Sequence, residues 1–161
     1  MKYKYVKELM TSPAISCETT TTIKETINIL KENNIGFLPI TKKGILVGVV
    51  TDRDILIRGI GIYKLNTKIN KVMTNGDIYF VNPETSLHEA AQKMADYKVR
   101  RLVVLNDGKV IGVLTAKNLL IEPELFQYIA KTYLPNYTLP AYSMYTNSNP
   151  HDNVKAADYP L

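Results

Sequence analysis

One segment of this sequence occurs twice. Residues 48–56 read GVVTDRDIL, and residues 112–120, which lie 64 positions later, read GVLTAKNLL. Two further pairs of segments return at nearly the same spacing: KELMT at 7–11 with NKVMT at 70–74, and IGFLPI at 35–40 with VRRLVV at 99–104. Several matches at one spacing indicate an internal repeat, and two copies are too few for a solenoid. We therefore expect two similar lobes related by a pseudo-two-fold axis.

Both copies predict an amphipathic helix in their first half. Apolar residues recur there at positions i, i+4 and i+7, which lie on one face of a helix. They are Ile23, Ile27 and Leu30 in the first copy, and Leu87, Ala91 and Met94 in the second. Thr22 and Ser86 stand just before these helices, and each is followed three residues later by a glutamate. This spacing is the capping-box pattern, so both helices carry a local signal for where they begin.

Two strands and a second helix follow in each copy. The strands are expected at 37–41 and 45–51, and again at 102–105 and 109–115, and the helices at 52–59 and 116–121. Asp107 and Gly108 tolerate positive φ, so they favour a tight hairpin turn between the later strands. Short extended pieces are expected before the first helices, at 14–16 and 78–81. The order is then β-α-β-β-α in each repeat, and the predicted fold class is α/β (α+β).

The repeat also divides the chain into segments. The first copy takes residues 1–64 and the second takes residues 65–122; residues 123–161 form a C-terminal extension with 5 of the 8 prolines and 6 of the 11 tyrosines. A short helix is expected at 124–132, whereas the later prolines disfavour a long helix or a central strand. Tyrosine is enriched at interfaces, so the tail is expected to dock on a surface, with a disordered tail as the alternative.

Composition and charge limit the class of protein. The chain has 161 residues and a net charge of +5, with charges of both signs spread along the sequence. Nucleic-acid binding usually shows a denser basic stripe, so it is the weaker alternative here. Cys17 is the single cysteine, and no apolar run approaches the ~20 residues that span a bilayer. We expect a soluble cytoplasmic protein with no membrane partner.

The repeated segment carries the best candidate chemistry. In the first copy a strand ends at Thr51 and a helix begins at once, with Asp54 three residues later; Thr115 and Asn118 take these places in the second copy. A threonine hydroxyl at a helix N-terminus suits a phosphate oxygen, and a carboxylate can accept from both ribose hydroxyls. The same spacing is also a capping box that needs no ligand, so the pattern alone leaves both interpretations open.

The order of these motifs resembles the CBS domain. KELMT, an amphipathic helix, FLPI and GVVTDRDI follow one another in the first copy, and KVMT, RRLVV and GVLTAKN do so in the second. The pair is similar to a Bateman module and covers about residues 5–122, roughly three-quarters of the chain. The resemblance implies two lobes packed sheet to sheet, with two clefts. Family members commonly bind AMP, ADP or ATP, some bind S-adenosylmethionine or NAD-type ligands, and they often form disc-shaped dimers of pairs.

The resemblance also implies which residues contact a ligand. Thr51 and Asp54 would hold ribose and phosphate in one cleft, and Thr115 and Asn118 would do so in the other. Because Asn118 is neutral, its hydrogen bond to a ribose hydroxyl lacks charge assistance. The cleft that uses Asp54 is therefore expected to bind ribose better.

A basic segment is expected to bind the phosphate. Lys98, Arg100 and Arg101 match the place where the family often supplies phosphate-binding side chains, and arginine suits phosphate through bidentate contacts. Residues 34–37, at the same place in the first copy, carry no charge. This asymmetry indicates one phosphate site rather than two. The alternative is that the basic residues form an exposed corner between a helix and a strand.

The adenine is expected beside the two short extended pieces, held mainly by backbone groups. The residues concerned are Ile15 and Ser16 in the first copy, and Ile78 and Tyr79 in the second. The ring of Tyr79 either stacks on the base or is a buried core residue.

These observations predict a regulatory module rather than an enzyme. The sequence holds no P-loop and no nucleophile elbow, and His88 and His151 lack a metal-ligand pattern. The expected regulatory ligand is an adenosine nucleotide (AMP, ADP or ATP) or S-adenosylmethionine, and no cofactor is required. The chain is expected to form a homodimer and to signal to a protein partner. The alternative function is a scaffold for dimerisation or protein interaction, with vestigial clefts.

Overall fold

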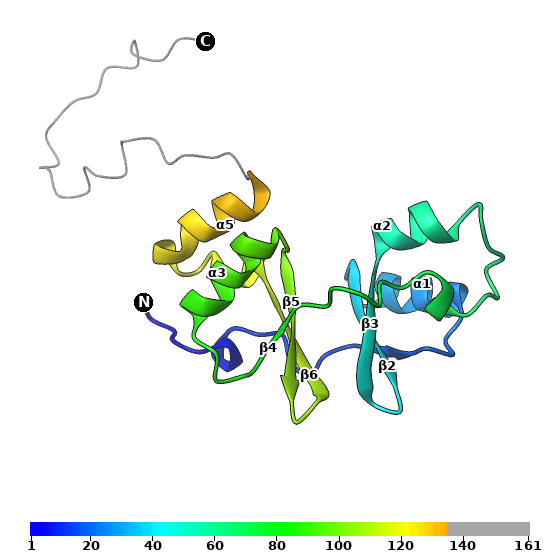
Figure 1. The fold of residues 1–161 in the computed structure, drawn as a ribbon, viewed down its shortest axis with the longest axis horizontal. Helices are drawn as coiled ribbons and strands as arrows, with labels where there is room; N and C mark the ends of the chain where they lie inside the picture. The colour runs from blue at the N-terminus through cyan, green and yellow to red at the C-terminus, as the bar shows by residue number, and fades with distance from the viewer. Residues whose placement is uncertain (135–161) are drawn as a thin grey trace, which may run out of the picture.

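Two lobes lie side by side along the long axis of the molecule (Figure 1). The computed structural model describes residues 1–134. The first lobe holds β1 (Cys17–Glu18), α1 (Ile23–Glu32), β2 (Phe37–Lys42), β3 (Ile45–Thr51) and α2 (Asp52–Asp54), which a π-helical turn (Ile55–Gly59) extends. The second lobe holds β4 (Phe80–Val81), α3 (Leu87–Tyr97), β5 (Arg101–Asn106), β6 (Lys109–Thr115), α4 (Ala116–Leu119) and α5 (Phe126–Tyr133). Both the mixed α/β class and the β-α-β-β-α order of each repeat are confirmed.

The strands form a six-stranded sheet whose order, β1-β2-β3-β6-β5-β4, is symmetric about its centre. β1 pairs with β2 and β4 pairs with β5 in parallel, whereas the β2–β3 and β5–β6 hairpins are antiparallel. The hairpins meet where Ile45 of β3 pairs with Lys109 of β6. The symmetric order follows from the sequence repeat, because equivalent strands occupy equivalent places on either side of this contact.

Both hairpins turn on two residues with positive φ. Asp107 and Gly108 have φ of 49° and 75°, and Lys43 and Gly44 have φ of 54° and 79°. These values match the two-residue turns whose twist suits antiparallel strands. The turn predicted at Asp107 and Gly108 is confirmed, and the first repeat forms the same turn with a lysine in place of the aspartate.

The first extended piece lies later in the chain than expected. Strand β1 begins at Cys17 rather than within 14–16, because the preceding residues still run along the other lobe. There the Ala14 N–H donates to the Ile111 carbonyl at 3.2 Å. The chain joins its own lobe at Cys17, which pairs with Ile40 of β2. The second extended piece, expected at 78–81, includes strand β4.

Side-chain caps mark the start of α1 and α3. Thr22 Oγ1 accepts the Glu25 N–H at 3.2 Å, and the Glu25 carboxylate accepts the Thr22 N–H at 2.8 Å. Ser86 Oγ accepts the Glu89 N–H at 3.1 Å. Of the two, α1 has the full capping box, whereas the cap of α3 consists of the Ser86 side-chain bond.

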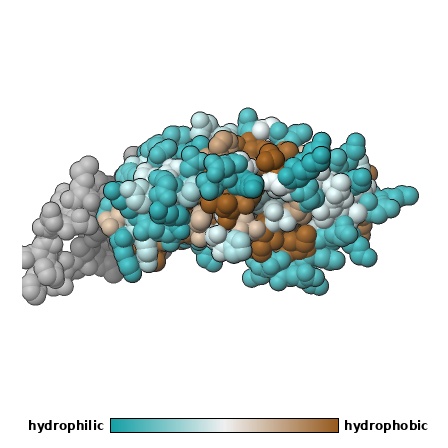
Figure 2. Space-filling view, turned by 90° about the horizontal axis from the view of Figure 1, so that it is seen from below, coloured by the Kyte–Doolittle hydropathy of each residue, from teal (hydrophilic) through white to brown (hydrophobic). Residues whose placement is uncertain are grey.

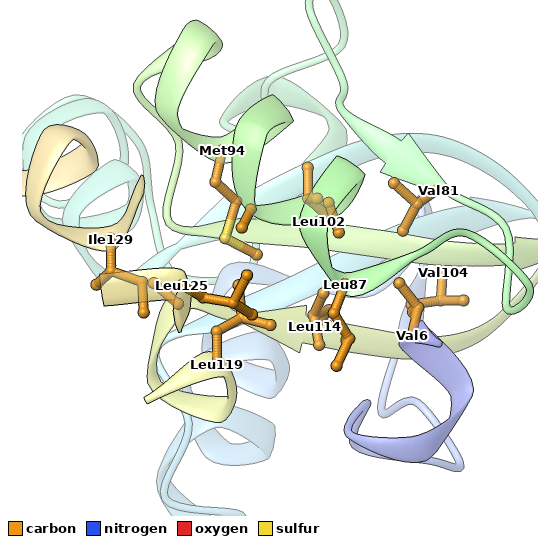
Figure 3. Packing of buried hydrophobic residues seen from close by; sticks show 13 residues of the cluster. Val6, Val81, Leu87, Met94, Leu102, Val104, Leu114, Leu119, Leu125 and Ile129 are labelled. Carbon is orange, nitrogen blue, oxygen red and sulfur yellow. The ribbon is translucent and has the colours of Figure 1, made fainter. Parts of the chain in front are cut away.

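Each lobe has its own apolar core, which is completed by the opening segment of the other repeat. These opening segments end in the repeated motifs at 7–11 and 70–74. In the second lobe, Val6 packs among residues of α3, β5 and β6, such as Leu87 and Leu114 (Figure 3). In the first lobe, Ile69 and Val72 pack in the same way against residues of α1 and β3. The opening segments of the two repeats are therefore exchanged between the lobes.

The C-terminal extension begins with the expected helix. A 3₁₀ turn at Pro123–Leu125 leads into α5, which packs against α3 and α4 of the second lobe. Residues 135–161, on which the expected docking of the tail falls, lie outside the described residues. Within residues 1–134, no helix is long and apolar enough to cross a membrane. The face of the molecule in Figure 2 is largely hydrophilic, with several hydrophobic patches near the middle of the long axis.

Candidate functional site

A cleft of about 640 Å³ is lined by residues of both lobes, and we call it the large cleft. Residues 34–37, between α1 and β2, form its wall in the first lobe. Most of its remaining lining comes from the second lobe and the crossing chain: Ile15, Arg100, Arg101, Thr115, Lys117, Asn118 and Tyr133. A volume of this size falls in the range of small-molecule sites, roughly 300–1,000 Å³.

The large cleft is positively charged. Arg100, Arg101 and Lys117 line it, and none of its described lining residues is an aspartate or glutamate. Within residues 1–134, none of these three side chains forms a salt bridge. Cations of one sign in a concave site raise the local concentration of an anionic ligand.

Each arginine of the large cleft rests against an aromatic ring. Arg101 Cζ lies 5.6 Å from the ring centroid of Phe37, and Arg100 Cζ lies 5.5 Å from that of Tyr133. The carbonyl of Arg100 accepts the Ala116 N–H at 2.9 Å, which joins the start of β5 to the start of α4. A guanidinium that stacks through its flat face keeps the N–H groups on its edge for an anion.

Thr115 and Asn118 form a reciprocal cap at the start of α4. Thr115 Oγ1 accepts the Asn118 N–H at 3.2 Å, and Asn118 Oδ1 accepts the Thr115 N–H at 2.8 Å. The Thr115 hydroxyl also donates to Asn118 Oδ1 at 2.7 Å. The capping interpretation is thus seen in the structure. Within residues 1–134 the Asn118 side-chain NH₂ makes no hydrogen bond, so it is the donor that this pair offers to a ligand.

Thr51 and Asp54 form the equivalent cap at the start of α2. Thr51 Oγ1 accepts the Asp54 N–H at 3.1 Å, and Asp54 Oδ2 accepts the Thr51 N–H at 2.9 Å. Asp54 Oδ1 forms a salt bridge with Arg58 Nη2 at 2.8 Å. Both carboxylate oxygens of Asp54 therefore already have a partner within the chain.

A second cleft, of about 240 Å³, opens beside Thr51, and we call it the small cleft. Lys98 and Tyr79 line it, and Arg100 and Arg101 line it as well as the large cleft. The ring of Tyr79 stacks on the ring of Tyr97, with centroids 4.4 Å apart, so one face of it is already covered. Lys98 has φ of 54° and ends helix α3 in the left-handed conformation.

The clefts combine residues of different repeats. Ile15 of the first repeat lies in the large cleft with Thr115 and Asn118 of the second, and Tyr79 of the second lies in the small cleft with Thr51 of the first. This combination follows from the exchange of opening segments. The extended piece after each opening segment, expected at 14–16 or 78–81, begins beside the other lobe.

Three predicted residues line neither cleft: Ser16, Asp54 and Ile78. Ser16 lies where the chain has already turned toward β1, and Asp54 is engaged by the cap and by Arg58. In the part of the chain that the structure describes, no group of three histidine, cysteine, aspartate or glutamate residues is arranged to hold a metal ion.

Tyr133 is a lining residue of the large cleft that sequence reasoning missed. The helix that carries it was expected, but nothing in the sequence says against which surface this helix packs. The one available signal was its position at the end of an amphipathic helix that directly follows the second repeat.

Two comparisons by sequence bear on this site. A family model described as the CBS domain matches residues 6–60 and 69–124. The CBS domain-containing protein YhcV of Bacillus subtilis is 31% identical to this chain over 117 residues, which is 72% of this chain and 83% of YhcV.

Two solved structures share the fold. The CBS domain protein PAE2072 from Pyrobaculum aerophilum, complexed with AMP, has a TM-score of 0.68 and 28% identity, over 78% of this chain and 98% of the other. The CBS domain pair of protein MJ0100, in complex with 5′-methylthioadenosine and S-adenosyl-L-methionine, has a TM-score of 0.65 and 27% identity, over 76% of this chain and 95% of the other.

Proposed function

Because this chain belongs to the CBS-domain family and carries two copies of the domain, we propose that it is a non-catalytic regulatory module that binds an adenosine nucleotide in the large cleft. The observation that carries this proposal is the charge of the cleft. Arg100, Arg101 and Lys117 line it without a described acidic neighbour in its wall, which suits the phosphates of AMP, ADP or ATP.

The same charge favours a phosphorylated ligand over S-adenosylmethionine. Of the two similar solved structures, PAE2072 is complexed with AMP, and the CBS domain pair of MJ0100 is in complex with 5′-methylthioadenosine and S-adenosyl-L-methionine. S-adenosylmethionine carries a sulfonium cation, which three nearby cations would repel. We therefore expect the order of affinity to be ATP or ADP above AMP, and AMP above S-adenosylmethionine.

Within the large cleft, Thr115 and Asn118 face the ribose in our proposal. The Asn118 NH₂ group donates to a ribose hydroxyl, and backbone groups near Ile15 contact the adenine. The sequence favoured the cleft that uses Asp54, but both Asp54 oxygens have partners and the cleft beside Thr51 has about 240 Å³. We propose one nucleotide site in each chain, with Asn118 rather than Asp54 on the ribose.

A thermal-shift screen against AMP, ADP, ATP, S-adenosylmethionine and NAD tests the proposal. A ligand at ~100 times its dissociation constant adds about 2.7 kcal/mol to the free energy of unfolding, which raises Tm by several degrees. We expect such a shift with ATP or ADP, and a smaller one in Lys117→Gln. Lys109→Gln, a lysine that lines neither cleft, is the matched control. The absence of any shift with all five compounds would refute the nucleotide proposal.

A second candidate function, self-association, is favoured by an apolar groove on the first lobe. The groove, of about 580 Å³, lies between α1 and the helix that begins with α2, and Ile27, Leu56 and Ile60 line it. Leu56 is 64% exposed. On the second lobe, α5 packs on the equivalent helices. An uncovered apolar surface of this kind marks an interaction site.

We propose that the groove is covered by a second copy of this chain. Lys31 and Asp52 both line it, so a two-fold arrangement can bring the lysine of one copy to the aspartate of the other. Leu56→Asp should convert a dimer to a monomer in light scattering coupled to size exclusion. Leu120→Asp changes the equivalent residue of the second repeat and should leave the dimer intact. A monomeric wild-type protein at micromolar concentration would contradict self-association.

A further inference from the structure

Helix α5 lies beyond the residues that the family model matches, yet it is built into the second lobe. The match ends at residue 124, and α5 begins at Phe126. Ile129 of α5 is nearly fully buried, as Leu125 is in the turn just before the helix, and both pack in the core with Met94 and Leu119 (Figure 3). The buried side of α5 thus fixes the helix on the lobe that supplies most of the large cleft.

The far end of α5 reaches the large cleft itself. Tyr133, in the last turn, lines the cleft and is half-exposed. Its ring centroid lies 5.5 Å from Arg100 Cζ. The Leu134 N–H donates to the Ala130 carbonyl at 2.8 Å, so a backbone hydrogen bond holds the helical turn that carries Tyr133. One of the cleft's cations therefore rests on a residue from outside the repeats.

We propose that Tyr133 is a positioning residue for Arg100, and that it couples the occupancy of the large cleft to the order of α5. This inference rests on the proposed function, because the cleft must bind an anion. A guanidinium stacks through its flat face and donates through its edge, so the ring and a phosphate can engage Arg100 together. Contact with the Tyr133 ring restricts the orientation of the Arg100 guanidinium. The arginine side chain therefore loses less conformational entropy when a phosphate binds.

The coupling must act in both directions. If stacking on Tyr133 raises the affinity for an anion, the bound anion stabilises the stacked arrangement by the same factor. Ligand binding should therefore slow hydrogen exchange in the last turn of α5, at residues 130–134.

Calorimetry with ATP and with adenosine separates positioning from a general loss of structure. Tyr133→Ala should lower the affinity for ATP roughly two- to five-fold, which is the contribution of a solvent-exposed cation–π contact. Its affinity for adenosine should equal that of wild type. Tyr133→Phe keeps the ring and should restore the affinity for ATP. Phe126→Ala removes an exposed aromatic side chain from the start of α5, away from both clefts, and should bind as wild type does. Equal affinity of wild type and Tyr133→Ala for ATP would overturn the proposal.

Hydrogen exchange tests the contact without any nucleotide. Arg100→Ala and Tyr133→Ala should each speed exchange at residues 130–134 in the free protein, and the double variant should be no faster than either. Rates equal to wild type in both single variants would overturn the contact. If wild type fails to bind ATP at all, the nucleotide proposal and the coupling fail together, while this measurement still decides whether Arg100 holds α5. If wild type binds ATP but exchange at 130–134 is unchanged by it, the coupling alone fails.

Discussion

The thioether of Met10 packs directly against the backbone of Gly112, so that a Cβ atom on Gly112 would lie 2.7 Å from Met10 Sδ. Met73 has the same relation to Gly48, at 2.6 Å. In each pair the methionine ends the opening segment of one repeat, and the glycine lies in a strand of the other. The two glycines of the repeated segment therefore allow a methionine from the other repeat to approach the sheet.

Replacing either glycine should destabilise the fold. In Gly112→Ala the new methyl group meets Met10 Sδ and the Thr11 carbonyl oxygen, which would lie 3.1 Å away. Such overpacking typically costs about 1–3 kcal/mol. Urea denaturation should show this loss for Gly112→Ala and for Gly48→Ala. Gly76→Ala, where a Cβ meets nothing within 4 Å, should change the free energy of unfolding little. Equal effects at all three positions would contradict the packing described.

The exchange of opening segments predicts that a mutation weakens the lobe on which its segment packs. Val6 is fully buried in the second lobe, and Ile69, its counterpart 63 positions later, is fully buried in the first. Truncation of a buried isoleucine to alanine costs about 2–5 kcal/mol, and truncation of the smaller valine costs less because fewer buried atoms are removed. Val6→Ala should raise hydrogen exchange first in α3, β5 and β6, and Ile69→Ala should raise it first in α1, β2 and β3. The opposite assignment would show that each opening segment packs on its own repeat.

The carboxylate of Glu18 makes the stability depend on acid pH. The Thr41 hydroxyl donates to it at 2.7 Å, and the Lys43 N–H donates at 3.0 Å. These bonds, that of Thr41 above all, lower the pKa of Glu18 below its ordinary value of 4.5. A carboxyl whose pKa is lower in the folded state stabilises the protein above its unfolded pKa, and that contribution is lost as pH falls through the folded pKa.

The free energy of unfolding of wild type should therefore fall more steeply than that of Glu18→Gln as pH drops from about 5 toward 3. Urea denaturation at a series of pH values measures both slopes. At pH 7 the variant should be the less stable of the two, and the gap should narrow in acid. Parallel curves for the two proteins across this range would show that the Glu18 carboxylate contributes nothing through its charge.

Substitutions of Asp54 and Asn118 should lower the stability equally but differ in their effect on the affinity for ATP. Both cap a helix, so Asp54→Ala and Asn118→Ala should each lower the free energy of unfolding by about 1 kcal/mol. Asn118→Ala should also weaken ATP roughly two- to ten-fold, the usual effect of removing one hydrogen bond, whereas Asp54→Ala should bind ATP as wild type does. Calorimetry decides between them. If Asp54→Ala alone lost affinity for ATP, the ribose would bind in the small cleft beside Thr51 instead.

Local signals predicted most of the elements. Strands β3 and β6 have the predicted bounds, 45–51 and 109–115, because a threonine followed by a helix start ends each of them. Thr22 and Ser86 mark the first helices because their side chains satisfy N–H groups that the helix leaves free. Such signals depend on residues close together in the chain, so sequence alone is enough to detect them.

Contacts between distant segments could not be predicted in the same way. The repeat shows that the segments at 7–11 and 70–74 are equivalent, but it does not say which lobe the neighbouring Val6 and Ile69 pack against. For the same reason Ile15 could be expected at an adenine but not assigned to the cleft of Asn118. Tyr133 was missed because its role depends entirely on where α5 packs.

The most direct test of a nucleotide site in the large cleft is amide chemical-shift mapping of ¹⁵N-labelled protein titrated with ATP. We expect saturable shifts concentrated at Ala14 and Ile15, at Arg100 and Arg101, and at 115–118, which together line or adjoin the large cleft. Shifts centred on 51–54 and 77–79 would place the ligand in the small cleft and contradict our assignment. A spectrum unchanged by millimolar ATP would show that the protein has no ATP site.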